Sequence, residues 1–75
     1  MDEKFKSILN GVNKKILVSK DMDLVEDGII DSLQIMILVS KLEAAYSCYI
    51  APKDIVQDNF ESVEAIWKMV ERCRK

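Results

Sequence analysis

The stretch DSLQIMILVSKLEAAY, residues 31–46, predicts the central helix of the fold. Asp31 is a favoured N-cap residue. Gln34 follows three positions later and completes a variant of the capping box, in which each side chain satisfies a free backbone N–H group. Apolar residues then recur at spacings of three and four, which predicts a helix with one face in the core. These residues are Ile35, Leu38, Val39, Leu42 and Tyr46.

The preceding half of the chain predicts one helix and one long loop. In residues 2–15 the same spacing places Phe5, Ile8, Leu9 and Val12 on one face, and Lys14 and Lys15 are expected in the last turn, where cations suit the helix dipole. Residues 16–30 keep no period for long, which favours an ordered loop. A strand at KILVS, residues 15–19, is the alternative, but no other segment offers it a partner strand.

The remainder of the chain predicts two more helices. Pro52 suits the first turn of a short helix, PKDIVQ, whose Ile55 and Val56 would enter the core. Ser62 can cap a last helix with an apolar face made of Val63, Ile66, Trp67 and Val70. The expected fold is all-α, a small bundle of three main helices and one short helix that forms a single domain over residues 1–75.

Composition excludes several classes of function. A net charge of −2 and the lack of clustered Lys and Arg argue against nucleic-acid binding. The chain has no histidine and its two cysteines form no Cys-x-x-Cys pair, so we expect no metal site, two reduced thiols and no enzyme activity. The charged opening does not resemble a signal peptide, and the longest apolar run is too short to span a bilayer. We therefore expect a cytoplasmic protein without membrane insertion.

Ser32 is the candidate functional residue. If Asp31 is the N-cap, Ser32 occupies the first helical position and its hydroxyl faces solvent. A phosphate attached there would lie near free backbone N–H groups and the positive end of the helix dipole, although the Asp31 carboxylate opposes it. No histidine, G-x-S-x-G turn or S-x-x-K lysine marks this serine as a nucleophile. The alternative is that Ser32 only assists helix initiation.

The segment DGIIDSLQIMILVSKLEAAYSCYIAP resembles the phosphopantetheine attachment region of acyl carrier proteins. In that family an Asp-Ser-Leu triplet, here Asp31, Ser32 and Leu33, opens the second helix. Gly28 followed by two aliphatic residues looks more like the D-alanyl and stand-alone carriers than the fatty-acid carriers. The order of helix, long loop, serine helix, short helix and FESV before the last helix extends the resemblance over essentially the whole chain. Ser47 replaces a glycine that is common in the family.

The resemblance implies a carrier without catalysis of its own. A phosphopantetheinyl transferase would move 4′-phosphopantetheine from coenzyme A to Ser32, with Mg²⁺ held by the transferase. A ligase would load an acyl or aminoacyl group on the arm as a thioester, and a downstream transferase or condensing enzyme would receive it. The implied carrier is monomeric. A specialised biosynthetic pathway fits better than housekeeping fatty-acid synthesis, because the serine helix lacks the usual row of carboxylates.

The partner surface is expected on the serine helix. Met36 falls at the flank of the core stripe and Ile37 on its far side, so with Leu33 they would form a small apolar patch. Lys41 lies further along this surface, and acid at Asp23, Glu26, Asp27 and Asp31 would steer partners toward it. The alternative from another class is a non-modified interaction module that binds a partner through the Leu33, Met36 and Ile37 patch.

Overall fold

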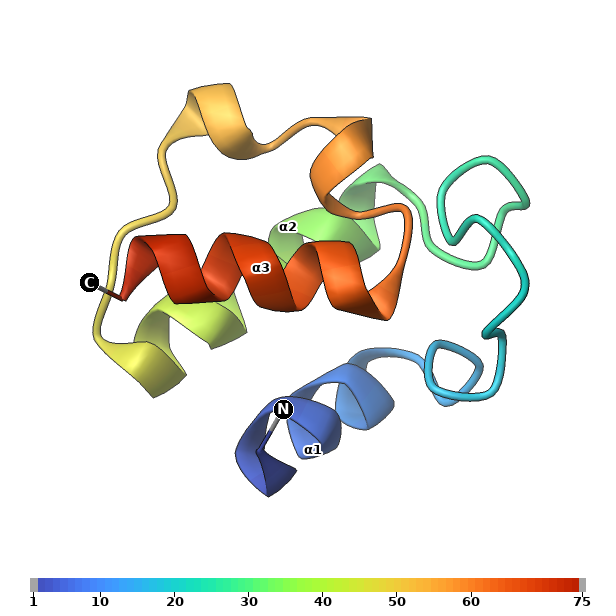
Figure 1. The fold of residues 1–75 in the computed structure, drawn as a ribbon, viewed down its shortest axis with the longest axis horizontal. Coiled ribbons are helices and arrows are strands. Elements are labelled where there is room, and N and C mark those ends of the chain that lie inside the picture. The colour runs from blue at the N-terminus through green and yellow to red at the C-terminus, as the bar shows by residue number, and fades with distance from the viewer. Residues whose placement is uncertain (1, 75) are drawn as a thin grey trace.

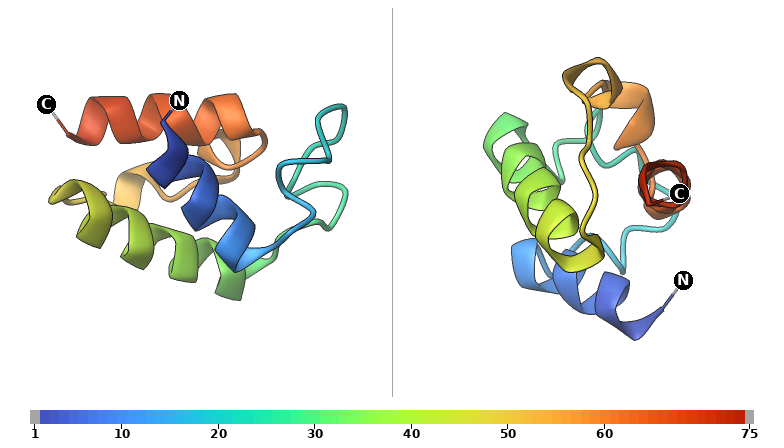
Figure 2. Two further views of the ribbon diagram at one scale, coloured as in Figure 1. Left: turned by 90° about the horizontal axis from the view of Figure 1, so that it is seen from below. Right: turned by 90° about the vertical axis from the view of Figure 1, so that its left-hand side faces the viewer.

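The structure is a computed structural model that describes residues 2–74; Met1 and Lys75, which the predicted domain includes, lie outside the described residues. Three α-helices, α1 (Glu3–Val12), α2 (Ser32–Tyr46) and α3 (Val63–Cys73), surround one core, and the described residues contain no strand. Figures 1 and 2 show that α2 and α3 run in the same direction, with α1 beside them. The all-α bundle with three main helices is confirmed.

Helix α1 is shorter than predicted. Oδ1 of Asp2 accepts a hydrogen bond of 2.8 Å from the N–H of Phe5 and caps the helix, which ends at Val12. Asn13 then takes an extended conformation, and its Oδ1 accepts a hydrogen bond of 2.9 Å from the N–H of Lys15. Lys14 and Lys15 therefore lie in the turn after α1, and placing them in its last turn was wrong. An asparagine that can bond its own following backbone favours a turn over a further helical residue.

The loop between α1 and α2 has no regular secondary structure, but buried side chains and backbone hydrogen bonds hold it in place. Ile16, Leu24 and Ile30 are buried. The N–H of Leu24 donates to the carbonyl of Glu61 at 2.8 Å, and the N–H of Ile30 donates to the carbonyl of Leu24 at 2.9 Å. The prediction of a long ordered loop is confirmed, and the alternative strand at residues 15–19 is not formed.

Helix α2 begins and ends at recognisable signals. Oδ1 of Asp31 accepts a hydrogen bond of 2.9 Å from the N–H of Gln34, which confirms Asp31 as the N-cap. Ser47 ends the helix in the left-handed conformation, with φ of 51°. The N–H groups of Ser47 and Cys48 both donate to the carbonyl of Glu43. These bonds satisfy a carbonyl that the helix end would otherwise leave without a partner.

The segment between α2 and α3 differs from the single short helix that was predicted. It holds two 3-10 turns, η1 (Pro52–Asp54) and η2 (Gln57–Asn59), separated by Ile55 and Val56. Ile55 packs against the core, whereas Val56 is exposed and does not enter it. Short 3-10 turns let the chain change direction twice over these few residues. As predicted, Ser62 caps α3, because its Oγ accepts a hydrogen bond of 3.0 Å from the N–H of Ala65.

The core lies between the three helices and the long loop. Phe5 of α1 packs its ring against Trp67 of α3, with centroids 4.8 Å apart and ring planes at 62°. Because aromatic side chains bury large apolar areas, this pair links the first and last helices directly. The buried residues of the core are Phe5, Leu9, Ile16, Leu24, Ile30, Leu38, Val39, Leu42, Ile50, Phe60, Ile66, Met69 and Val70.

Candidate functional site

Ser32 is the first residue of α2, and this helix begins directly after the long loop (Figure 1). Its side chain is exposed, as the capping analysis predicted. The N-cap Asp31 uses its carboxylate for the N–H of Gln34 and its carbonyl for the N–H of Ile35 at 2.9 Å. The amides of Ser32 and Leu33 are therefore the N–H groups that this helix end leaves for an anion at Ser32.

Gln34 does not complete the predicted capping box. Its Oε1 instead accepts a hydrogen bond of 3.2 Å from Nδ2 of Asn13. The same Nδ2 group donates to the carbonyl of Ile29 at 2.7 Å. Asn13 thus ties the end of α1 to the loop and to the first turn of α2. This link positions the helix start that presents Ser32, and no short-range sequence signal reveals it, because the paired residues are far apart in the chain.

The acidic loop before Ser32 is folded on itself. Oδ1 of Asp23 accepts hydrogen bonds from the N–H groups of Val25 and Glu26, at 3.0 and 2.8 Å. Oδ2 of Asp27 accepts one of 2.9 Å from the N–H of Asp23. Gly28 follows with φ of +75°, a conformation that suits glycine. Asp23 and Asp27 therefore shape the loop by capping its turns, besides placing negative charge close in sequence to Ser32.

A cleft of about 240 Å³ opens beside Ser32. Ile35 of α2, Ile55 and Phe60 provide part of its apolar wall. Gln57 lines the cleft as well, and its Nε2 donates a hydrogen bond of 3.0 Å to Oε2 of Glu26. Ser32 thus lies at the edge of a small, mainly apolar cleft, and the bond between Gln57 and Glu26 links η2 to the long loop beside it.

The predicted partner surface is exposed along α2. Leu33, Met36 and Ile37 have 69%, 53% and 39% of their surfaces accessible to solvent. Asp27 and Lys41, the charged members of the predicted surface, are also exposed. Val56 was expected in the core but is 46% exposed, and it lines the cleft next to Ser32. Sequence periodicity missed it because its segment is not one continuous helix.

The described residues show no cluster of side chains that could bind a metal ion. Residues 2–74 bring together no group of three or more Cys, Asp or Glu side chains able to hold a metal ion. No helix in the part of the chain that the structure describes is long and apolar enough to cross a membrane.

The chain is similar to D-alanyl carrier proteins. Such proteins from Lactococcus lactis subsp. cremoris strains MG1363 and SK11 and from L. lactis subsp. lactis strain IL1403 are each 33% identical to it over 46 residues. The match covers 61% of this chain and 58% of each relative, so it spans a little over half of their length. No protein-family model matches the chain. No solved structure matches it. The relatives confirm the resemblance to small carrier proteins and do not favour the non-modified interaction module.

Proposed function

We propose that this chain, similar over 46 residues to D-alanyl carrier proteins, holds an acyl or aminoacyl group as a thioester on a 4′-phosphopantetheine arm attached to Ser32. The observation that carries the proposal is the position of Ser32. An exposed hydroxyl follows the capping residue Asp31 at the start of α2, inside the Asp-Ser-Leu triplet. A serine needed only for helix initiation gains nothing from a cleft beside it, whereas an attachment point needs open access.

The attachment step joins Oγ of Ser32 to a phosphorus atom of coenzyme A. Oγ attacks the phosphate next to the pantetheine unit, the pyrophosphate P–O bond breaks, and adenosine 3′,5′-bisphosphate leaves. The proton of the hydroxyl passes to a base of the transferase, which also supplies Mg²⁺. This division of roles fits a chain whose described residues hold no histidine base and no metal-binding group. Under this proposal the carrier is not itself an enzyme.

The first turn of α2 fits the phosphate that this reaction leaves on Ser32. The amides of Ser32 and Leu33 and the positive end of the helix dipole favour an anion there, against the opposing charge of Asp31. Once attached to Ser32, the arm would supply a terminal thiol. A thioester on that thiol transfers its acyl group more readily than an oxygen ester does. The tether also raises the local concentration of the cargo at a partner's active site.

We further propose that the cleft beside Ser32 receives apolar parts of the arm or its cargo. Ile35, Ile55 and Phe60 offer apolar surface there. Because the cleft occupies only about 240 Å³, it suits a short group better than a long acyl chain. An aminoacyl or short acyl cargo is consistent with this size.

Partner enzymes are proposed to bind the apolar patch of Leu33, Met36 and Ile37 on α2. They comprise the transferase, a loading ligase and a downstream transferase or condensing enzyme. Exposed apolar side chains next to an attachment point give a partner area to bury. Asp27 and its acidic neighbours would steer such partners, with Lys41 at the far side of the patch.

Intact-protein mass spectrometry tests the attachment site. The chain is incubated with coenzyme A, Mg²⁺ and a broad-specificity phosphopantetheinyl transferase. The wild type should gain one phosphopantetheine, and Ser32→Ala should gain none. Ser40→Ala, which changes an exposed serine of the same helix, is the matched control and should be modified like the wild type. An unmodified wild type with a folded helical spectrum would remove the carrier function and return the interaction module to consideration.

Transferase kinetics test the partner surface. A Met36→Gln, Ile37→Gln double variant should raise the KM of the transferase for the carrier, with a smaller change in kcat. Val18→Gln is the matched control, because Val18 is 78% exposed in the long loop and lies outside the proposed patch. Equal KM values for the two variants would contradict the proposed surface without affecting the attachment site.

A further inference from the structure

Cys48 and Cys73 are far apart in sequence but close together in the fold. Cys48 follows the left-handed Ser47 at the end of α2, where its N–H donates to the carbonyl of Glu43 at 3.3 Å. Cys73 is the last residue of α3, and its Sγ donates a hydrogen bond of 3.0 Å to the carbonyl of Tyr49. This bond places the Cys73 sulfur beside the residue that directly follows Cys48. The parallel course of α2 and α3 brings their C-terminal ends to the same end of the molecule (Figures 1 and 2).

The environment of Cys73 differs from that of a solvated thiol. Burial, followed by the interaction with the Cys48 thiol, raises the pKa of Cys73 to about 12. The nearby carboxylates of Glu43 and Asp54 act in the same direction. Cys73 is therefore protonated at neutral pH. Because the thiolate is the attacking species in thiol–disulfide exchange, Cys73 is a poor first nucleophile.

We propose that Cys48 and Cys73 are a redox modification site that closes to an intramolecular disulfide on reaction with a low-molecular-weight disulfide. In the first exchange the sulfur of Cys48 attacks the reagent, whose S–S bond breaks; a mixed disulfide forms, and one reagent sulfur leaves and takes up the proton that Cys48 loses. The sulfur of Cys73 then attacks Sγ of Cys48, the bond between Cys48 and the reagent breaks, and the second reagent sulfur leaves as a thiolate that takes up the proton lost by Cys73. The two cysteines lose two electrons in total, and the reagent is reduced to two thiols.

The disulfide would fasten the segment after α2 to the end of α3. It would replace the hydrogen bond from Cys73 to Tyr49 with a covalent link. Helix α2 has 15 residues, so Ser32 lies roughly 20 Å from this link at a rise of about 1.5 Å per residue. Oxidation would thus stabilise the bundle without covering Ser32. The inference does not depend on the proposed carrier function.

Reaction with oxidised glutathione tests the site. The chain without an arm is compared with Ser32→Ala, Cys48→Ser and Cys73→Ser, and each product is examined by intact mass and by titration of free thiols. The wild type and Ser32→Ala should both lose two hydrogens, retain no free thiol and carry no glutathione. Cys73→Ser should accumulate one glutathione at Cys48, and Cys48→Ser should react more slowly. The oxidised wild type should melt at least about 10 °C above the reduced form, as expected for a closed loop of this size.

Three results would overturn the proposal. One is a wild type that keeps both free thiols under conditions in which Cys73→Ser is fully modified. The second is a wild type that ends with glutathione on its cysteines, and the third is a disulfide between two chains. The Ser32→Ala variant separates a failure of the disulfide proposal from a failure of the carrier proposal. This variant can form the disulfide but cannot accept phosphopantetheine.

Discussion

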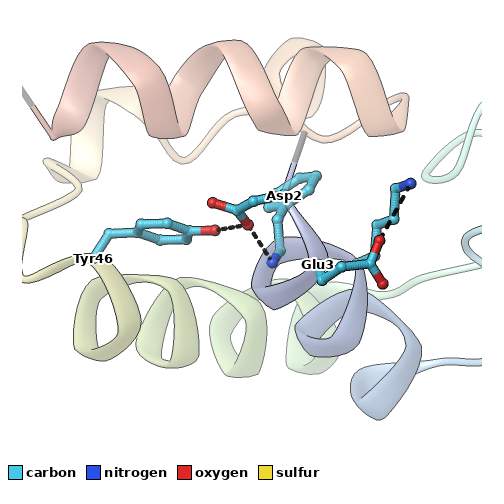
Figure 3. Close-up of polar contacts among 5 residues, drawn as sticks. Asp2, Glu3 and Tyr46 are labelled. Atoms are coloured by element: carbon cyan, nitrogen blue, oxygen red, sulfur yellow. Dashed lines mark hydrogen bonds and ion pairs between the residues drawn. The ribbon is translucent and has the colours of Figure 1, made fainter.

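The phenol of Tyr46, at the end of α2, donates a hydrogen bond of 2.8 Å to Oδ1 of Asp2, the residue that caps α1 (Figure 3). The same Asp2 oxygen accepts from the N–H of Phe5, so one carboxylate serves a helix cap and a link between helices. The ring of Tyr46 lies under Nζ of Lys4 at 4.4 Å and near the guanidinium of Arg74 at 5.0 Å. Residues from both ends of the described chain therefore contact the side chain of Tyr46.

This arrangement predicts how stability depends on pH. The hydrogen bond from Phe5, followed in size by that from Tyr46, holds the pKa of Asp2 below 3.8. The contribution of the Asp2 carboxylate to stability is therefore present above pH 3.8 and is lost as pH falls through the lowered pKa. Burial, followed by the bond to Asp2, raises the pKa of Tyr46 from 10.0 to about 12. Folding thus favours the neutral phenol. The contribution of Tyr46 to the free energy of unfolding is complete below pH 10.0 and is lost as pH rises through about 12.

Tyr46→Phe should lower the melting temperature at neutral pH and weaken both pH-dependent losses. Thermal melts by circular dichroism between pH 2 and pH 12 measure these effects. Tyr49→Phe is the matched control and should behave like the wild type, because Tyr49 is 72% exposed. Identical pH profiles for Tyr46→Phe and the wild type would contradict a stabilising role for the bond to Asp2.

The two glycines should respond in opposite directions to alanine. Gly11 lies inside α1 with open space around its Cα, so Gly11→Ala should stabilise the protein by about 1 kcal/mol. Gly28 has φ of +75°, so Gly28→Ala should destabilise it by about 1–2 kcal/mol although the added Cβ meets no atom. Urea unfolding measures both values. Equal effects of the two substitutions would show that backbone conformation does not decide the outcome.

Ser47→Gly should stabilise the protein. Ser47 ends α2 in the left-handed region, which glycine adopts without strain, and the gain should be about 0.5–1 kcal/mol. Ser40→Gly, inside the same helix, is the matched control and should cost about 0.5–1 kcal/mol. The free energies of unfolding come from urea titration. A destabilised Ser47→Gly variant would mean that the serine side chain contributes more than the strain costs.

Asn13→Ala should destabilise the protein by about 1–3 kcal/mol, because it leaves the carbonyl of Ile29 and the side chain of Gln34 without their partner. Asn10→Ala is the control, since Asn10 is exposed within α1 and alanine is the better helix former. Hydrogen exchange should localise the loss at the start of α2. Uniform loss of protection over the whole chain would contradict a local positioning role for Asn13.

Local patterns were sufficient for the three main helices and for the exposure of Ser32. Helical spacing located the buried faces of α1, α2 and α3, and capping chemistry located Asp31 and Ser62. The errors arose where local signals compete. Apolar residues at Ile55 and Val56 were read as a helix face, but the segment breaks into two 3-10 turns that expose Val56. A favourable charge pattern at Lys14 and Lys15 was outweighed by the turn at Asn13.

Contacts between distant residues could not be read from spacing. The link from Asn13 to Gln34, the bond from Tyr46 to Asp2 and the approach of Cys73 to the segment after Cys48 each depend on how the helices pack. These residues come within reach of one another only once the helices have packed into the bundle. The exposure of Ser32 was predictable because it depends on its position in one helix, whereas the cleft beside it is built by three segments.

The closure of the chain around Tyr46 has a practical consequence for handling the protein. Asp2 and Arg74 both lie at the end of α2 that is opposite Ser32. A purification tag, a fluorescent label or a surface linker attached near either residue would therefore project away from the serine. Such attachments can immobilise the protein with the Ser32 end facing free solution, provided that they leave the Asp2 carboxylate available to Tyr46.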